Sequence, residues 1–315
     1  PRVARHPRIA ALARTGAHLV QRRHLSGTAS GRQWLRRLLG RDDWPRVRVA
    51  LEDFGPDVLL LNQGGVFDFT LEHRLIDWYS NRNLPIFLYC NCNSDAWSLG
   101  AEHRAFTREI FADAASIFFV STHNWRLAER QLAMSIDRAQ VIQNPIDDSL
   151  RTSPPPWPST TVPACAVVAR IDAHHKGLDI LIPALAAAWP SDAHWVINLY
   201  GTGPDEDYVN ALARRYGLAD RIRLLGFTSD IRKIWAHNHL MLMPSRHEGC
   251  SIAMLEALAC ARPVVATAVG GVSDWITDGV NGFVCPAPTV DLLVSTLIQT
   301  WAARSRWAEL GANAG

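Results

Sequence analysis

Residues 239–267 combine a short apolar run, a glutamate-containing loop, an apolar helix and a second apolar run. The first run is 239–244, the loop enters the helix at 248–251, and the second run is 264–266. This order predicts a strand, a loop, a helix and a strand. In a parallel βαβ unit, the end of the first strand and the start of the helix face one crevice. The stretch therefore predicts an α/β fold with a parallel sheet.

Two carboxylates belong to this unit, Glu248 in the loop and Glu256 in the helix. The helix N-terminus offers unpaired backbone N–H groups and a positive dipole end, which favour phosphate. A loop carboxylate can accept hydrogen bonds from hydroxyl groups, such as those of a sugar. The helix N-terminus and the loop carboxylate thus predict a site for a ligand that carries both phosphate and hydroxyl groups. The alternative interpretation is an exposed acid and a helix salt bridge.

The length of 315 residues, 48% of them hydrophobic, is enough for two domains. Residues 151–163 contain five prolines, which cannot continue a helix or a central strand and predict a semi-rigid linker. We therefore predict an N-terminal domain over residues 1–150 and a C-terminal domain over residues 164–315.

Alternating apolar runs and helical patterns before the linker predict a second parallel sheet. The expected strands are 57–61, 85–89, 115–120 and 140–142, and the expected helices are 71–82, 101–113 and 124–134. A further helical pattern covers 8–22, where a Rossmann-like domain would begin with a strand and a Gly-rich turn. We therefore expect that the start of this domain is truncated or that the chain is a fragment.

Residues 1–50 are strongly basic, with twelve arginines against Asp42 and Asp43. Within them, 31–41 fits either a helix lying on an anionic membrane surface or a solvated helix face, and we favour the second. The net charge of +2 gives no argument for nucleic acid. Without an apolar run of membrane-spanning length or a secretory leader pattern, we expect a cytoplasmic protein, either soluble or peripheral on the inner membrane surface.

The six cysteines show neither Cys-x-x-Cys spacing nor a paired metal framework. We expect most of them to be buried, reduced thiols.

Five landmarks in the second half of the chain are 169–185, 199–204, 221–227, 248–267 and 269–284. Together they resemble the family 4 retaining glycosyltransferases, whose GT-B fold consists of two facing Rossmann-like domains. The landmarks follow that family's order and spacing over roughly 120 residues. The resemblance implies metal-independent transfer of a sugar by front-side displacement, from a nucleotide-diphosphate sugar of the UDP or GDP type and with no other cofactor.

The resemblance also implies roles for individual residues. Arg170 and Lys176 would bind the donor diphosphate and stabilise the leaving group, and Glu248 would contact the donor sugar. Arg offers a planar fork to phosphate oxygens and Lys a point charge, which suits both to this task. Glu256 would bind the ribose. The remaining donor-binding candidates are Gly201, Gly203, Phe227, Gly249, Cys250, Ser251, Gly270 and Gly271.

Polar residues after the predicted strands of the first domain are candidates for binding a glycan or glycolipid acceptor. They are Gln63, Gly64, Asn91, Asn93, Asp95 and His123. Each is also explained by a turn or a helix cap. Many family members place a histidine near the reacting sugar, whereas this chain has YCNCNSDAW at 89–97. Asparagine can donate to a hydroxyl but does not titrate near neutral pH.

Two other functions fit the same motifs. A sugar-nucleotide epimerase would share the fold but needs an ionisable acid and base in the N-terminal domain. A non-catalytic sugar-nucleotide binding or scaffold protein would explain the missing first strand and the missing histidine. Binding without turnover distinguishes the last of these from an enzyme.

Overall fold

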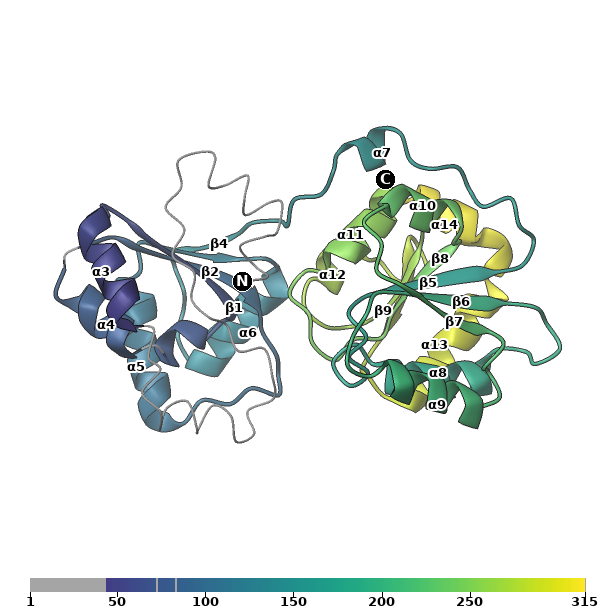
Figure 1. The fold of residues 1–315 in the computed structure, drawn as a ribbon, viewed down its shortest axis with the longest axis horizontal. Coiled ribbons are helices and arrows are strands. Elements are labelled where there is room, and N and C mark those ends of the chain that lie inside the picture. Colours follow the sequence, from purple (N-terminus) through teal and green to yellow (C-terminus); the bar gives the residue numbers. More distant parts are fainter. Residues whose placement is uncertain (1–43, 72, 83, 315) are drawn as a thin grey trace.

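The computed structural model describes residues 44–71, 73–82 and 84–314 (Figure 1). The helical pattern at 8–22 and the basic segment at 31–41 lie outside the described residues. Within the described part, two α/β domains follow one another along the chain and are joined by an extended segment (Figure 1).

The N-terminal domain is built on a four-stranded parallel sheet in the order β1-β2-β3-β4. Consecutive strands are neighbours, so each intervening helix crosses over to the next strand. The elements are α3 (Trp44–Phe54), β1 (Leu59–Gly65), the 3-10 helix η2 (Asp68–Leu71), α4 (His73–Ser80), β2 (Ile86–Cys92), α5 (Ala101–Asp113), β3 (Ser116–Phe119), α6 (Thr122–Leu132) and β4 (Ala139–Val141).

The predicted loop at 62–65 is wrong because β1 continues through it, and the loop predicted from Asn91 begins only after Cys92, where β2 ends. Gln63 pairs with Cys90 and Gly65 with Cys92, so 62–64 and Asn91 lie within the sheet. Asparagine and glycine favour turns in local sequence, but the hydrogen-bond ladder with the neighbouring strand overrides this preference.

The C-terminal domain contains a six-stranded parallel sheet in the order β10-β9-β8-β5-β6-β7. This is the doubly wound order. From β5 the chain adds β6 and β7 on one side, and it then crosses to the other side of β5, where it adds β8, β9 and β10. Its elements are β5 (Ala164–Val168), α8 (Leu178–Ala188), β6 (Val196–Tyr200), α9 (Glu206–Arg215), β7 (Ile222–Gly226), α10 (Ile231–Ala236), β8 (Leu240–Met243), α11 (Ile252–Ala259), β9 (Val264–Thr267), α12 (Val272–Trp275), β10 (Gly282–Cys285), α13 (Val290–Ala302), η3 (Arg304–Arg306) and α14 (Trp307–Ala312).

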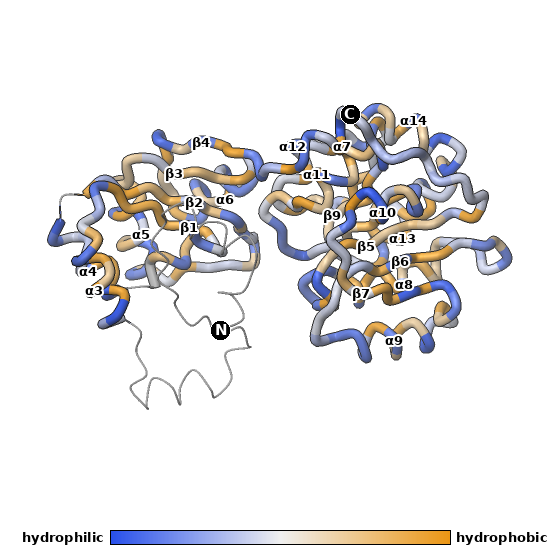
Figure 2. Tube along the Cα trace, turned by 45° about the horizontal axis from the view of Figure 1, so that its top comes forward, coloured by the Kyte–Doolittle hydropathy of each residue, from blue (hydrophilic) through white to orange (hydrophobic). Residues whose placement is uncertain are grey.

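Helices cover both faces of the six-stranded sheet, so its central strands are apolar throughout. Every residue of β8 and β9 is buried. Figure 2 shows that the hydrophobic segments of both domains concentrate in the strands at their centres. The βαβ unit predicted from 239–267 is therefore confirmed as β8, α11 and β9.

The connection between the domains begins with a short helix, α7 (Ser149–Thr152), so the first residues of the predicted linker are helical. The rest of the linker is irregular, as its prolines predict. It is anchored rather than free, because Arg262 donates hydrogen bonds to the carbonyl oxygens of Pro155 (3.2 Å) and Pro156 (2.6 Å).

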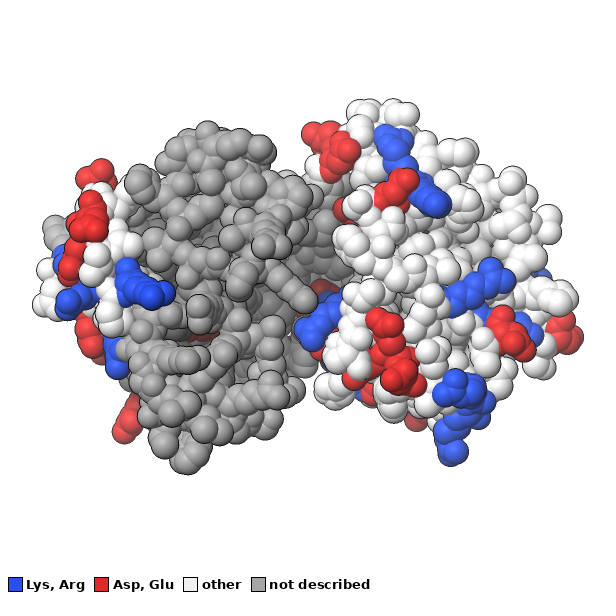
Figure 3. Space-filling model, viewed as in Figure 1, with Lys and Arg blue, Asp and Glu red and all other residues white. Residues whose placement is uncertain are grey.

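Charges of both signs are interspersed over the face of the C-terminal domain seen in Figure 3. Among the described residues, no helix combines the length and the apolar character needed to cross a membrane.

Candidate functional site

A cavity of about 260 Å³ lies where the C-terminal sheet reverses its strand order. The ends of β5 and β8 form its floor, and Arg170, Lys176, Glu248 and Ser251 are among the residues that line it. Ligands of doubly wound folds bind at the carboxyl ends of the strands at such a reversal. The fold thus brings three predicted catalytic residues and one predicted donor-binding residue to one crevice.

Glu248 is held by two donors inside this cavity. The Lys176 Nζ lies 2.8 Å from Glu248 Oε1, and the Ser245 hydroxyl donates to the same oxygen at 2.7 Å. The side chains of Lys176 and Glu248 are only 20% and 12% exposed. Solvent therefore screens this ion pair less than an ordinary surface pair.

The loop that carries Glu248 is fixed to the neighbouring β5–α8 loop. Arg246 forms a two-pronged ion pair with Asp179 of α8, with N–O distances of 2.7 and 2.8 Å. Its backbone N–H also donates to the His175 carbonyl at 3.0 Å. Bidentate pairs of this kind restrict orientation, so the loop reaches the cavity in a defined position.

Arg170 lies at the exposed end of the same loop. Its side chain is 64% exposed, and its guanidinium is 3.9 Å from Asp172. An exposed pair at this distance holds the side chain weakly. Arg170 is therefore free to turn toward an anion bound at the cavity mouth.

The N-terminus of α11 closes one side of the cavity. Ser251 caps this helix, because its hydroxyl accepts a hydrogen bond from the Met254 N–H at 3.3 Å. Glu256 is half-buried one turn further along, outside the residues that line the cavity. The structure thus places the two glutamates differently: Glu248 lines the crevice, and Glu256 lies on the helix beside it.

The two glycines after β6 allow its loop to lie against the loop after β5. A Cβ atom on Gly201, whose φ is +140°, would lie 1.8 Å from the Ala169 carbonyl oxygen. One on Gly203 would lie 2.1 Å from the Ile171 carbonyl oxygen. Both positions therefore require glycine for packing. Phe227 follows β7 with 78% of its surface exposed, which leaves its ring free to stack on a ligand.

Gly249 lies where the Glu248 loop meets both domains. Its carbonyl accepts the Gly271 N–H at 2.6 Å. A Cβ atom here would lie 1.6 Å from the Asn91 carbonyl oxygen of β2 and 3.0 Å from Val120. Gly270 lies against the same loop with φ of +55°. These glycines let three backbone segments meet beside Glu248.

We expect Gly249→Ala to separate the two domains, because the Asn91 backbone in a central strand cannot move aside. Small-angle X-ray scattering should show a larger radius of gyration, while circular dichroism stays unchanged. Gly100→Ala is the matched control, since no atom lies within 4 Å of its added Cβ. An unchanged radius in Gly249→Ala would contradict the close approach.

Two predicted acceptor ligands have their side chains engaged within the N-terminal domain. Gln63 is buried, donates to the Cys90 sulfur at 3.2 Å and accepts from the Phe69 N–H at 2.9 Å. The Asn91 amide donates to the Asn62 side chain at 2.5 Å and to the Gln63 carbonyl at 2.6 Å. Both polar side chains form hydrogen bonds that join β1 to β2 or to η2. These bonds explain why the two residues are polar without a ligand.

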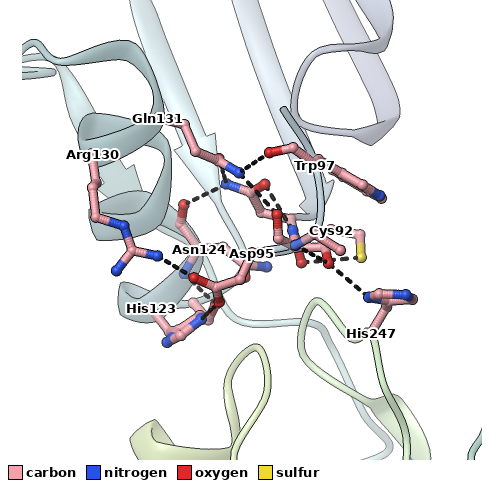
Figure 4. Close-up of polar contacts among 12 residues, drawn as sticks. Cys92, Asp95, Trp97, His123, Asn124, Arg130, Gln131 and His247 are labelled. Atoms are coloured by element: carbon pink, nitrogen blue, oxygen red, sulfur yellow. Dashed lines mark hydrogen bonds and ion pairs between the residues drawn. The ribbon is translucent and has the colours of Figure 1, made fainter. Parts of the chain in front are cut away.

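The other predicted acceptor residues lie in or after three neighbouring strands: Gly64 in β1, Asn93 and Asp95 after β2, and His123 in α6 after β3. Figure 4 shows Asp95 and His123 side by side. Asn93 is buried and bonded to Gln131 of α6 at 2.9 Å. Asp95 pairs with Arg130, and His123 Nε2 lies 3.9 Å from its carboxylate. Gly64 lies within β1, next to the Asp68 carboxylate. Of this group, Asp95 and His123 leave part of their side chains exposed, 63% and 35% respectively.

Contacts between the domains involve the predicted donor-binding residue Cys250 and several residues that the sequence did not single out. Ser94 Oγ lies 2.7 Å from His247 Nδ1, and the Thr122 N–H donates to Asp274 at 2.7 Å. The Asn144 amide donates to the Cys250 carbonyl at 2.7 Å. His247 directly precedes Glu248, and this adjacency was the one signal that could have pointed to it.

Burial keeps the cysteines near the site in the thiol form. It raises the pKa of Cys92 and of Cys250 to about 11. The prediction of free thiols is confirmed for all six cysteines, five of which are buried. Over the described ranges, no group of three or more His, Cys, Asp or Glu side chains is arranged to hold a metal ion.

The C-terminal domain matches a known protein family in sequence. Residues 162–302 match the family model of the glycosyl transferases group 1, so the chain contains a domain of this kind. Over 170 residues the chain is 32% identical to one component of the phosphatidylinositol N-acetylglucosaminyltransferase of Homo sapiens, covering 52% of this chain and 34% of that protein. It is 33% identical over 147 residues to the lipopolysaccharide core biosynthesis mannosyltransferase LpsB of Rhizobium meliloti, covering 44% of this chain and 42% of that protein. The matches thus span less than half of either relative.

Solved structures share the two-domain architecture. Sucrose-phosphate synthase from Thermosynechococcus elongatus superposes with a TM-score of 0.72 at 17% identity, covering 94% of this chain and 76% of that one. Anabaena HepE in complex with UDP superposes with a TM-score of 0.65 at 21% identity, covering 81% and 72%. These neighbours confirm the predicted GT-B arrangement of two Rossmann-like domains.

Proposed function

We propose that this chain is a retaining glycosyltransferase that moves a sugar from a nucleotide-diphosphate sugar to a hydroxyl group of a glycan or lipid acceptor. The observation that carries the proposal is the cavity at the strand reversal of the C-terminal sheet. It places a cation, Lys176, and a hydroxyl-binding carboxylate, Glu248, 2.8 Å apart beside a helix N-terminus.

This arrangement matches the two halves of the proposed donor. The diphosphate would lie near Lys176, Arg170 and the first turn of α11, where cations and backbone N–H groups favour negative charge. Glu248 would accept hydrogen bonds from sugar hydroxyls. The ion pair with Glu248 holds the Lys176 ammonium at the position where the diphosphate would lie.

In the proposed reaction, the bond between the sugar anomeric carbon and the diphosphate oxygen breaks, and the acceptor oxygen bonds to the same face of that carbon. The bonding electrons leave with the nucleoside diphosphate, and the acceptor proton passes to its phosphate oxygen. Negative charge grows on the leaving group during this step, so Lys176 and Arg170 would stabilise the transition state more than the bound donor. The step needs no protein nucleophile and no metal ion.

We further propose that the domain within residues 164–315 binds a donor of the UDP or GDP type and that the domain within residues 1–150 binds the acceptor. Support for the donor class comes from HepE, whose structure contains UDP, and support for the acceptor class from the activities named for the two relatives. Asp95 and His123, which remain partly exposed, are the acceptor ligands this proposal favours.

Thermal unfolding in the presence of UDP, GDP or ADP tests the donor site. A nucleotide at roughly a hundred times its dissociation constant should add about 2.7 kcal/mol to the free energy of unfolding. We expect one nucleotide to raise the melting temperature of the wild-type chain, and Arg170→Ala and Glu256→Ala to remove this shift.

The result also separates the alternative functions. No shift with any nucleotide, in a folded protein, would contradict the donor site. A shift without transfer of sugar to any glycan or lipid acceptor would favour a non-catalytic binding protein. Conversion of the donor sugar to its epimer, in place of transfer, would identify an epimerase.

A further inference from the structure

Two loops, one from each domain, meet directly beside Glu248. The N-terminal partner is the loop 93–97 after β2, and the C-terminal partner is the loop 245–249 after β8. Asn93 and Glu248 form an isolated antiparallel backbone bridge. Next to it, Ser94 Oγ lies 2.7 Å from His247 Nδ1 (Figure 4). We name this pair of contacts the interdomain bridge.

The N-terminal side of the interdomain bridge is rigid. Gln131 of α6 donates to the Ser94 carbonyl at 2.8 Å and accepts from the Asn93 amide at 2.9 Å. The Asn93 carboxamide oxygen in turn accepts the Ser94 N–H at 2.8 Å. Ser94 is only 6% exposed. Its hydroxyl therefore has a fixed position relative to the N-terminal domain.

The C-terminal side connects His247 to the donor cavity. The His247 carbonyl accepts a hydrogen bond from His175 Nε2 at 3.1 Å, in the loop that also carries Lys176. The imidazole packs against Trp97 of the opposite domain, with ring centroids 6.5 Å apart. One peptide bond further on, the Glu248 carboxylate is fixed by Lys176. Any shift of His247 therefore moves the backbone of Glu248.

We propose that His247 is a positioning residue, which joins Ser94 of the N-terminal domain to the Glu248 loop and so holds Glu248 in place when the two domains are together. The inference rests on the proposed function for the role of Glu248. Its structural part, a link that keeps the domains together, is independent of that function.

A neutral imidazole with its proton on Nε2 allows the Ser94 hydroxyl to donate to His247 Nδ1. The same hydroxyl oxygen accepts the Ala96 N–H at 3.2 Å. Burial lowers the pKa of His247, as do the neighbouring His175, His174 and Arg246, while Glu248 raises it. The neutral form therefore predominates when the domains are together.

A double-mutant cycle on Ser94→Ala and His247→Ala tests the proposal. One hydrogen bond contributes about 1 kcal/mol, or roughly fivefold in rate. We expect each single variant to lower kcat about fivefold and the double variant to be no slower than either single variant. The affinity for nucleotide, measured by calorimetry, should change less than about twofold in all three variants. His174→Ala, which removes an exposed imidazole from the neighbouring loop, should leave kcat unchanged.

Interdomain distances give a readout that does not depend on activity. Spin labels on Glu109→Cys in α5 and Asp207→Cys in α9, both exposed positions, report the separation of the domains. We expect a single narrow distance distribution that broadens in Ser94→Ala, in His247→Ala and in the double variant to the same extent. If the chain bound no nucleotide, the proposed function would fail, yet this measurement would still test the interdomain bridge.

The change of the interdomain distance distribution at acid pH is a third readout. Separation of the domains would remove part of the burial that lowers the pKa of His247, while His175, His174 and Arg246 stay beside it. Separated domains therefore bind a proton at His247 more readily than joined domains, so the joined state loses stability as the pH falls, and the distance distribution should broaden there. His247→Ala should lack this change. Additive effects in the cycle, or a distribution that stays narrow in all three variants, would overturn the proposal.

Discussion

Lys176→Ala should reduce kcat for sugar transfer by about 10²–10³-fold, the loss expected when one preorganised electrostatic contact to a developing charge is removed. The wild-type ammonium lies 2.8 Å from the Glu248 carboxylate, in the crevice where the diphosphate is proposed to leave. Its removal also takes the cation away from Glu248, which is only 12% exposed and keeps the hydrogen bond from the Ser245 hydroxyl. Steady-state kinetics with a radiolabelled donor sugar measure the effect.

The chain contains its own control, because Lys233 is its only other lysine and lies exposed on α10. Lys233→Ala should keep wild-type kcat. Lys176→Arg keeps the charge and should recover part of the loss, although the planar fork cannot reproduce a point charge. Equal kcat values for Lys176→Ala and Lys233→Ala would remove Lys176 from the proposed mechanism.

Arg262→Met should lower the free energy of unfolding by about 3–5 kcal/mol, the range for breaking a buried charged network. Arg262 is 1% exposed, and its guanidinium donates to the carbonyls of Trp235, Asn238 and Cys260 in addition to the two linker prolines. Burial lowers its pKa to about 10, which still leaves it charged at neutral pH. The substitution leaves these buried carbonyl oxygens without their donor. Urea unfolding followed by tryptophan fluorescence measures the change.

Arg232 provides the comparison, because it makes the same kind of contact at the surface. Its guanidinium donates to the carbonyls of Ser153 and Ser149, at 2.6 and 2.8 Å, at exposed positions. Water can replace these bonds, so Arg232→Ala should cost about 1 kcal/mol or less. Losses of similar size in the two variants would show that burial of Arg262 is not what makes its contacts strong.

The cavity at the strand reversal was predictable because its residues follow local rules. Arg170 and Lys176 flank a loop after a predicted strand, and Glu248 and Ser251 belong to the next strand–loop–helix unit. In a doubly wound sheet, loops after parallel strands gather at one edge, so local pattern and topology together bring these residues to one crevice. Glu256, predicted for the same site, lies on the helix beside the cavity and not among its lining residues.

Residues 62–64 and Asn91 show where local pattern fails. Their composition is typical of turns, yet pairing with the neighbouring strand extends β1 and β2 through them. The side chains of Gln63 and Asn91 are then engaged by hydrogen bonds within their own domain. A sequence contains the polar residues, but only the register between strands decides whether they reach a cleft or an internal partner.

The sequence by itself determined the fold class and the main residues of the cavity at the strand reversal, because strand and helix periods and loop chemistry are properties of short segments. The tertiary structure alone decided which distant residues meet. Ser94 and His247 are 153 positions apart, and Arg262 reaches linker carbonyls 106 and 107 positions away. Such contacts depend on how two separately folded domains and their linker pack, and no period or spacing within a short segment encodes that arrangement.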